Sequence, residues 1–179
     1  MIQVTVQPDK ETTNKMFFKI QPLIDFRTAI RNATERLLDE VKRLAPKATG
    51  DYLRSISSTV REYDSPYRMH GIVYSSHQAA EVIEFGADPH TVPIRAITRW
   101  MQAVGMRISK NLTIEDVAYR IQKKIEERGL RPHNVFTSAY DNAESYFHYT
   151  IDPIMNTIGG SAEYTVILRS TGLRSLPWE

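Results

Sequence analysis

The clearest pattern in the chain is an apolar residue at every third or fourth position across 22–44. Residues at this spacing share one face of a helix, and here they are Leu23, Phe26, Ile30, Ala33, Leu37, Val41 and Leu44. Charged residues lie mostly between them, so the pattern predicts an amphipathic helix of about six turns. Pro22 suits its first turn, and Pro46 marks its end. Such a helix needs a sheet or other helices to cover its apolar face.

Several short segments have strand character instead. Ile2–Val6 alternates apolar and polar residues, which is typical of a short edge strand. Further strands are predicted over 16–20, 52–60, 71–75 and 163–168, with a hairpin loop at 62–66 between the second and third of these.

Four later segments have helical spacing, and they are 77–85, 94–104, 113–128 and 134–158. Thr113 and Asp116 resemble a capping pair at the start of the third, and Pro153 bends or interrupts the last. Met101, Ile108, Ile114 and Ile121 are expected in the core. The fold class is therefore α+β: the long helix and shorter helices pack on a small, mainly antiparallel sheet. We expect one domain over 1–158 and an extended C-terminal arm over 159–179, after the break at Gly159-Gly160.

Composition excludes several classes of protein. The 179 residues suit one domain, and 41% hydrophobic with 25% charged residues is normal for a globular chain. The net charge of +2 comes from interleaved acidic and basic residues, so no basic stripe marks a sequence-specific nucleic-acid ligand. The absence of cysteine excludes disulfides, thiolate nucleophiles and cysteine-based zinc sites. No apolar run approaches the roughly 20 residues of a membrane span.

Candidate chemistry is sparse. His90 and His133 with an acidic residue are a conceivable metal site, but exposed loop histidines are the favoured interpretation. Glu81 and Glu84 lie three residues apart on a short helix, where two carboxylates can act as acid and base. Solvation of one and pairing of the other is the favoured interpretation. We therefore expect no catalytic residue, no metal and no cofactor.

Three segments together resemble a known family. Leu44–Ile56, with Pro46 and Thr49-Gly50, is similar to a Pro-x-x-Thr-Gly-x-Leu-x-x-Ser signature that follows a long helix. Ala79–Gly86 is similar to a Tyr-Ala-x-x-x-Glu-aromatic-Gly helix, and Ile121–Phe136 to a late helix, glycine turn and Pro-x-x-Phe-Phe entry into a final helix. These motifs, in this order, resemble the tail-completion family of lambdoid long-tailed bacteriophages, also called minor-tail or neck proteins. The chain departs from them at Tyr52 (Leu in the family), Ala79 (Tyr), Ala87 (Thr) and Val135 (Phe).

The resemblance implies an α+β structural protein without catalytic activity. It implies a homo-oligomeric ring, commonly a hexamer, at the head–tail junction of the virion, assembled in the host cytoplasm. The implied partners are head-connector and tail-terminator or tube proteins, with no membrane and with DNA only as a passing neighbour in the lumen. Two alternatives remain open: a small metal-dependent hydrolase and a DNA-binding accessory protein.

Two sets of residues are expected to have structural roles. Arg54 and Glu84 belong to the first two motifs, and we hypothesise that they form an ion pair between strand and short helix. A subunit interface is expected at the C-terminus, where the strand with Tyr164, Val166 and Leu168 adds to a neighbour's sheet edge. Leu173, Leu176 and Trp178 would anchor in a partner's groove. The alternative is a strand that folds back on its own body.

Overall fold

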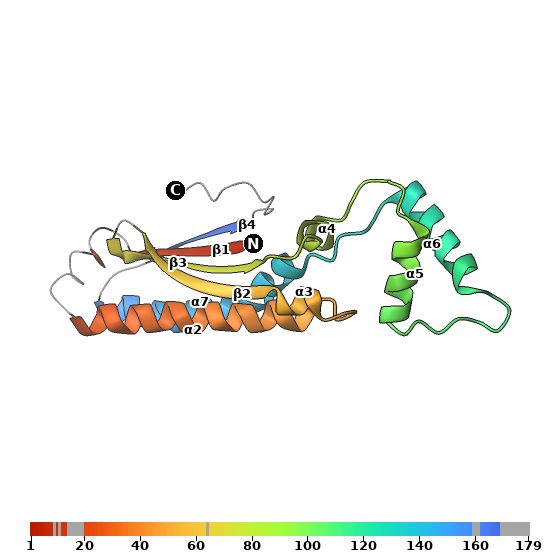
Figure 1. The fold of residues 1–179 in the computed structure, drawn as a ribbon. Helices are drawn as coiled ribbons and strands as arrows, with labels where there is room; N and C mark the ends of the chain where they lie inside the picture. The colour runs from red at the N-terminus through yellow and green to blue at the C-terminus, as the bar shows by residue number, and fades with distance from the viewer. Residues whose placement is uncertain (9, 11, 14–19, 64, 159–161, 169–179) are drawn as a thin grey trace.

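The computed structural model describes the chain except for residues 9, 11, 14–19, 64, 159–161 and 169–179 (Figure 1). It shows an elongated molecule with a body and, at one end, a small helical lobe. The elements in chain order are β1 (Ile2–Pro8), α2 (Ile20–Leu44), α3 (Asp51–Arg54), β2 (Ile56–Tyr63), β3 (Ser65–Ser75), α4 (Ala80–Phe85), α5 (Ile94–Ala103), α6 (Ile114–Arg128), α7 (Val135–Ile158) and β4 (Ala162–Leu168). The α+β class is confirmed: helices pack on a small antiparallel sheet.

The sheet has four strands in the order β2-β3-β1-β4, and every neighbouring pair is antiparallel. β1 is therefore an inner strand, and its predicted edge position is wrong. Val4 lies opposite Gly71 of β3 on one side and Val166 of β4 on the other. The alternation read from the sequence still places Ile2, Val4 and Val6 in the apolar core, each at most 2% exposed.

Helices α2 and α7 lie side by side and cover one face of this sheet (Figure 1). α2 contacts β2 and β3, whereas α7 contacts β1 and β4. Phe26, Ile30 and Leu37 of α2 are at most 1% exposed, as are Phe136 and Ile151 of α7. Burying each such side chain stabilises the fold by about 1.5–3 kcal/mol. The predicted long helix and its apolar face are confirmed.

One glycine sets how closely α2 approaches the sheet. A Cβ at Gly71 would overlap the hydroxyl of Thr34. That hydroxyl is itself held within α2, because Thr34 Oγ1 donates to the carbonyl of Ile30 at 2.7 Å. The glycine therefore allows the middle of α2 to lie directly on β3.

Two sequence predictions near α3 and β4 need correction. The strand predicted over 52–60 begins only at Ile56, because Asp51–Arg54 form a helical turn that starts at Gly50, φ +77°. This turn places the Tyr52 side chain in the core at 5% exposure. Residues 162–168 are not part of an arm, because they form β4 and pair with β1 along its whole length. The strand predicted over 16–20 lies outside the described residues except for Ile20, which begins α2.

The lobe has a core of its own. Ile97 and Met101 of α5 pack on Ala118 and Ile125 of α6, and Ile108, Ile114 and Ile121 surround them. Of the predicted core positions, Met101 is thus buried and the three isoleucines are partly buried, but in a second cluster separate from that of the body. Helical periodicity predicts that one face of a helix is covered, but it does not show which element covers it. The sequence alone therefore does not separate the core of the lobe from that of the body. Each helix in the described ranges is too short or too polar to cross a membrane.

Candidate functional site

The Glu84 carboxylate is the best-connected buried polar group between α4 and α7. Its side chain is 4% exposed. Oε2 accepts the Phe136 amide at 2.8 Å, and Oε1 accepts the Thr137 amide at 3.0 Å and the Thr137 hydroxyl at 2.8 Å. The first amides of a helix have no acceptor within the helix, and a carboxylate there also favours the helix dipole. Glu84 therefore caps the start of α7.

The backbone reinforces this junction. The amide of His133 donates to the carbonyl of Ile83 at 2.8 Å, and the amide of Asn134 donates to the carbonyl of Glu84 at 3.2 Å. Asn134 has φ +49°, a left-handed conformation that asparagine tolerates better than most residues. The end of α4 and the start of α7 are consequently fixed to each other by both main chain and side chain.

The hypothesised Arg54–Glu84 ion pair is not formed. Arg54 Nη2 instead lies 2.5 Å from Asp51 Oδ1, and both side chains are more than half exposed. The turn of α3 places these two residues on its solvent side, whereas Glu84 points at the start of α7. The hydroxyl of Thr49 and then the guanidinium of Arg54 hold the pKa of Asp51 below its ordinary value.

The negative charge of Glu84 also acts on the hydroxyl of Tyr52 and on the amino group of Met1. Burial, together with that negative charge, raises the pKa of Tyr52 to about 12. Its hydroxyl is buried without a hydrogen-bond partner among the described residues, and its ring packs edge-on against His77 at 5.8 Å. Burial lowers the pKa of the Met1 amino group, and Glu84 opposes this shift. The charge of Glu84 thus acts on both groups, of which Tyr52 is buried and Met1 partly buried.

The acid–base interpretation of Glu81 and Glu84 is not supported by their surroundings. Glu81 is exposed, whereas Glu84 is buried and holds three donors of α7. The two carboxylates therefore face different environments. His90 is exposed, and its Nδ1 lies 2.7 Å from the carbonyl of Asp88. Among the described residues, no group of three or more histidine, aspartate and glutamate side chains is arranged to hold a metal ion.

A narrow stalk joins body and lobe. Ala87 and Leu130 exchange two backbone hydrogen bonds, at 3.0 and 2.8 Å. The glycine before each of them, Gly86 or Gly129, has a positive φ, and a Cβ there would overlap the carbonyl oxygen of Leu130 or Ala87 respectively. The two chain segments can approach this closely only because both positions are glycine.

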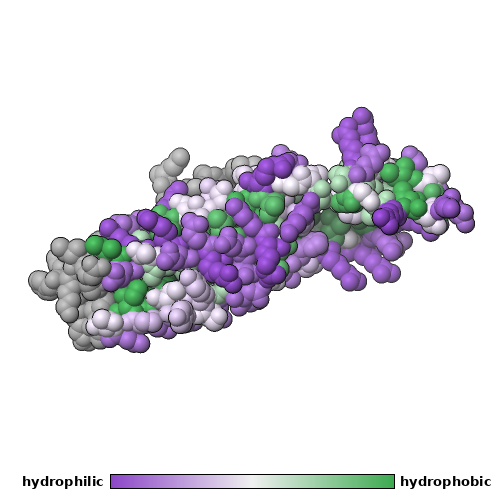
Figure 2. Space-filling model, turned by 90° about the horizontal axis from the view of Figure 1, so that it is seen from below, coloured by the Kyte–Doolittle hydropathy of each residue, from purple (hydrophilic) through white to green (hydrophobic). Residues whose placement is uncertain are grey.

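The α5–α6 lobe presents an apolar helix face to solvent. Ala96, Trp100, Ala103 and Val104 follow one another at intervals of four, three and one residues and are all exposed, Trp100 by 46% and Val104 by 38%. This spacing places them on one side of α5, next to the stripe that packs on α6. We call these four residues the outer α5 face. Figure 2 shows hydrophobic residues at the surface of the lobe, between hydrophilic ones.

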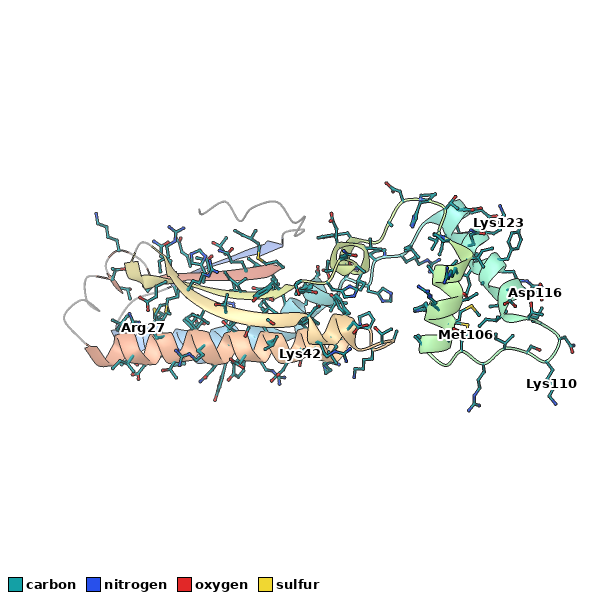
Figure 3. The ribbon with its side chains drawn as sticks, viewed as in Figure 1. Arg27, Lys42, Met106, Lys110, Asp116 and Lys123 are labelled. Atoms are coloured by element: carbon teal, nitrogen blue, oxygen red, sulfur yellow. The ribbon has the colours of Figure 1, made fainter. Side chains whose placement is uncertain are left out.

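The lobe is also basic. Residues 87–130 contain eight lysines and arginines against five aspartates and glutamates, a net charge of +3 in a chain of net +2. Lys110 and Lys123 point outward, with Met106 on the loop after α5 (Figure 3). The predicted capping pair is confirmed, because the Asp116 amide donates to Thr113 Oγ1 at 3.1 Å and the Thr113 amide donates to Asp116 Oδ2 at 2.9 Å. The lobe is thus a pair of helices in which the N-terminus of α6 is capped. Its surface is basic and partly apolar.

The expected C-terminal interface is only partly described. β4 folds back on its own sheet, so that Val166 lies opposite Val4, Tyr164 opposite Val6 and Leu168 opposite Ile2. This is the second of the two alternatives for the strand, although β4 remains at the sheet's edge. Leu173, Leu176 and Trp178 lie outside the described residues. The outer α5 face was missed at the sequence level, although its apolar spacing around Trp100 was visible there.

Comparisons of the chain with protein-family models, curated proteins and solved structures found no match.

Proposed function

We propose that this chain is a structural subunit of a bacteriophage virion, and that it forms a ring at the head–tail junction joining the tail to the head connector. The proposal starts from the resemblance of three sequence segments to tail-completion proteins. It gains support from the way these segments come together. Glu84 of the second segment caps α7 at Phe136 of the third, and Tyr52 of the first is buried in the same core cluster as Phe136.

This convergence is the observation on which the proposal depends most. Motifs that match by chance have no reason to meet in one junction, whereas motifs of one fold are retained because they contact each other. The polar groups of the junction hold backbone amides and face the core, as in a scaffold. The elongated shape, with a separate lobe at one end, gives a subunit two surfaces for its neighbours (Figure 1).

Quantitative mass spectrometry of purified virions tests the proposal. The phage whose genome encodes this chain is grown, and its particles are purified by density gradient. We expect the chain in the particles at a fixed low copy number, about six for a single ring, with the major capsid protein as internal standard. A lysate of phage that lack the chain should contain full heads and unattached tails. Infectious, fully joined particles without it would contradict the proposal.

A further inference from the structure

The lobe and helix α7 carry opposite net charges. In one copy of the chain, α5 lies apart from the middle of α7. α7 contains Asp141, Glu144 and Asp152 and neither lysine nor arginine, so the whole helix has a net charge of −3. The lobe has a net charge of +3. In Figure 1 the middle of α7 lies in the body, beside α2, whereas α5 lies in the lobe beyond the stalk.

Each of the two helices carries a pair of like charges and an exposed aromatic residue. On α5, Arg95 and Arg99 lie one turn apart next to the outer α5 face with Trp100. On α7, Asp141 and Glu144 lie on adjacent turns, and Tyr149, which is 77% exposed, lies further along the same helix. Helical spacing places the members of each charged pair about one turn apart, and all four are exposed.

These four charged side chains form no ion pair with another described residue. Arg95, Arg99 and Asp141 make no ion pair with another described residue, and Glu144 accepts only a long bond from Tyr140, at 3.4 Å. The pKa of Tyr140 is raised by burial and, in addition, by the negative charges of Glu144 and Asp141. The exposed side of α7 around Asp141 and Glu144 is thus negatively charged.

We propose that the α5–α6 lobe of one copy docks on α7 of a second copy, with Trp100 against Tyr149 and with Arg95 and Arg99 facing Asp141 and Glu144. The contact joins two different surfaces, so each copy has one of each free for a further neighbour. Such head-to-tail contacts close into rings or continue into filaments. The inference rests on the proposed ring and names the surfaces that form it.

Charge reversal in purified full-length protein tests the contact. R95E/R99E and D141R/E144R should each weaken self-association about tenfold or more in sedimentation velocity, because like charges then face each other. An equimolar mixture of the two variants should associate again, and so should the quadruple variant, because opposite charges are restored in both. R120E/K124E is the matched control: it reverses two exposed basic residues on α6 and should leave association near the wild-type value.

The apolar part of the contact has its own control. Trp100→Ala should weaken association, whereas Tyr119→Ala should not, although Tyr119 is similarly exposed at 51% on α6. Both variants should melt like the wild type. Added salt should weaken wild-type association, because the charged pairs are at the surface.

Cross-linking gives a second measurement on a chain without cysteine. A103C/S145C, treated with a flexible bismaleimide, should give a ladder of dimers, trimers and larger species, whereas A103C alone should not cross-link. Dimers from A103C alone would show lobe-to-lobe contact and overturn the inference. Wild-type protein that stays monomeric at millimolar concentration and low salt, or charge variants that fail to rescue each other, would also overturn it.

Failure of this inference is separable from failure of the proposed function. Virions that contain the chain while the charge variants assemble normally would retain the structural role and remove this contact. Conversely, rescue between the charge variants with no copy of the chain in virions would retain the contact and remove the structural role. Binding of duplex DNA by the monomer through Arg95 and Arg99, without self-association, would assign the lobe a different partner and overturn the inference.

Discussion

Ala87 and Leu130 exchange both of their backbone hydrogen bonds and thereby close the stalk between body and lobe. The pair forms no longer ladder, so it is the point at which the chain leaves the body and returns to it. Its geometry depends on Gly86 and Gly129, and this dependence leads to the first prediction.

Gly129→Ala should destabilise the stalk more than Gly105→Ala. Both positions have positive φ, which costs an alanine about 1 kcal/mol. A Cβ at Gly129 would in addition overlap the carbonyl of Ala87, whereas a Cβ at Gly105 would meet no described atom within 4 Å. Thermal unfolding and limited proteolysis at the stalk measure the difference. Equal melting temperatures for the two variants would contradict the close approach.

Glu84→Gln should lower the free energy of unfolding by about 2 kcal/mol. The two amides bond to different oxygens of Glu84, and a glutamine would replace one of these oxygens with an NH2 group, which is a donor. Hydrogen bonds to a charged group contribute about 1.5–3 kcal/mol, and this charge is also lost. Urea unfolding measures the change. Glu81→Gln is the control on the same helix, where an exposed side chain should change stability by about 0.5 kcal/mol or less.

Arg54→Ala should melt close to the wild type. Its partner Asp51 is exposed, and exposed ion pairs contribute little because water and salt screen them. Differential scanning calorimetry compares the two proteins. A loss of stability as large as that of Glu84→Gln would mean that Arg54 supports the buried junction after all.

Thr113→Ala should destabilise the lobe by about 1 kcal/mol, because it removes the cap of α6. Bonds from the Thr113 amide and then its hydroxyl hold the pKa of Asp116 below the ordinary value of 3.8. A carboxylate with a lowered pKa in the folded state stabilises above its ordinary value, and this contribution is lost as pH falls through the lowered pKa. Acid titration by NMR should therefore show an Asp116 midpoint below 3.8 in the wild type and closer to it in Thr113→Ala.

Tyr52→Phe should leave stability unchanged or slightly higher at neutral pH, because it removes a buried hydroxyl without a partner among the described residues. In the unfolded chain Tyr52 ionises near 10.0, but in the folded protein only at about 12. Its contribution is thus fully present below pH 10.0 and is lost as pH rises toward about 12. The free energy of unfolding in urea should fall less steeply with pH across this alkaline range for Tyr52→Phe than for Tyr119→Phe. Identical slopes would contradict the raised pKa.

Local patterns determined most of the secondary structure. The apolar spacing from Leu23 to Leu44 defined α2, because a helix repeats about every 3.6 residues whatever it packs against. Thr113 and Asp116 marked the start of α6 because a cap bonds only within its own turn. The same patterns identified Met101 as a buried position and Ile121 as a partly buried one.

Tertiary structure decided what no local pattern contains. β1 became an inner strand because β4, far along the chain, pairs with it, and strand order depends on partners. Glu84 caps α7 instead of pairing with Arg54, because the path of α4 points its carboxylate at free amides of a distant helix. The lobe separated from the body because Gly86 and Gly129 allow two distant segments to meet. The spacing of residues in the sequence thus determined which faces are apolar. Contacts between distant backbone segments determined which surfaces pack against those faces.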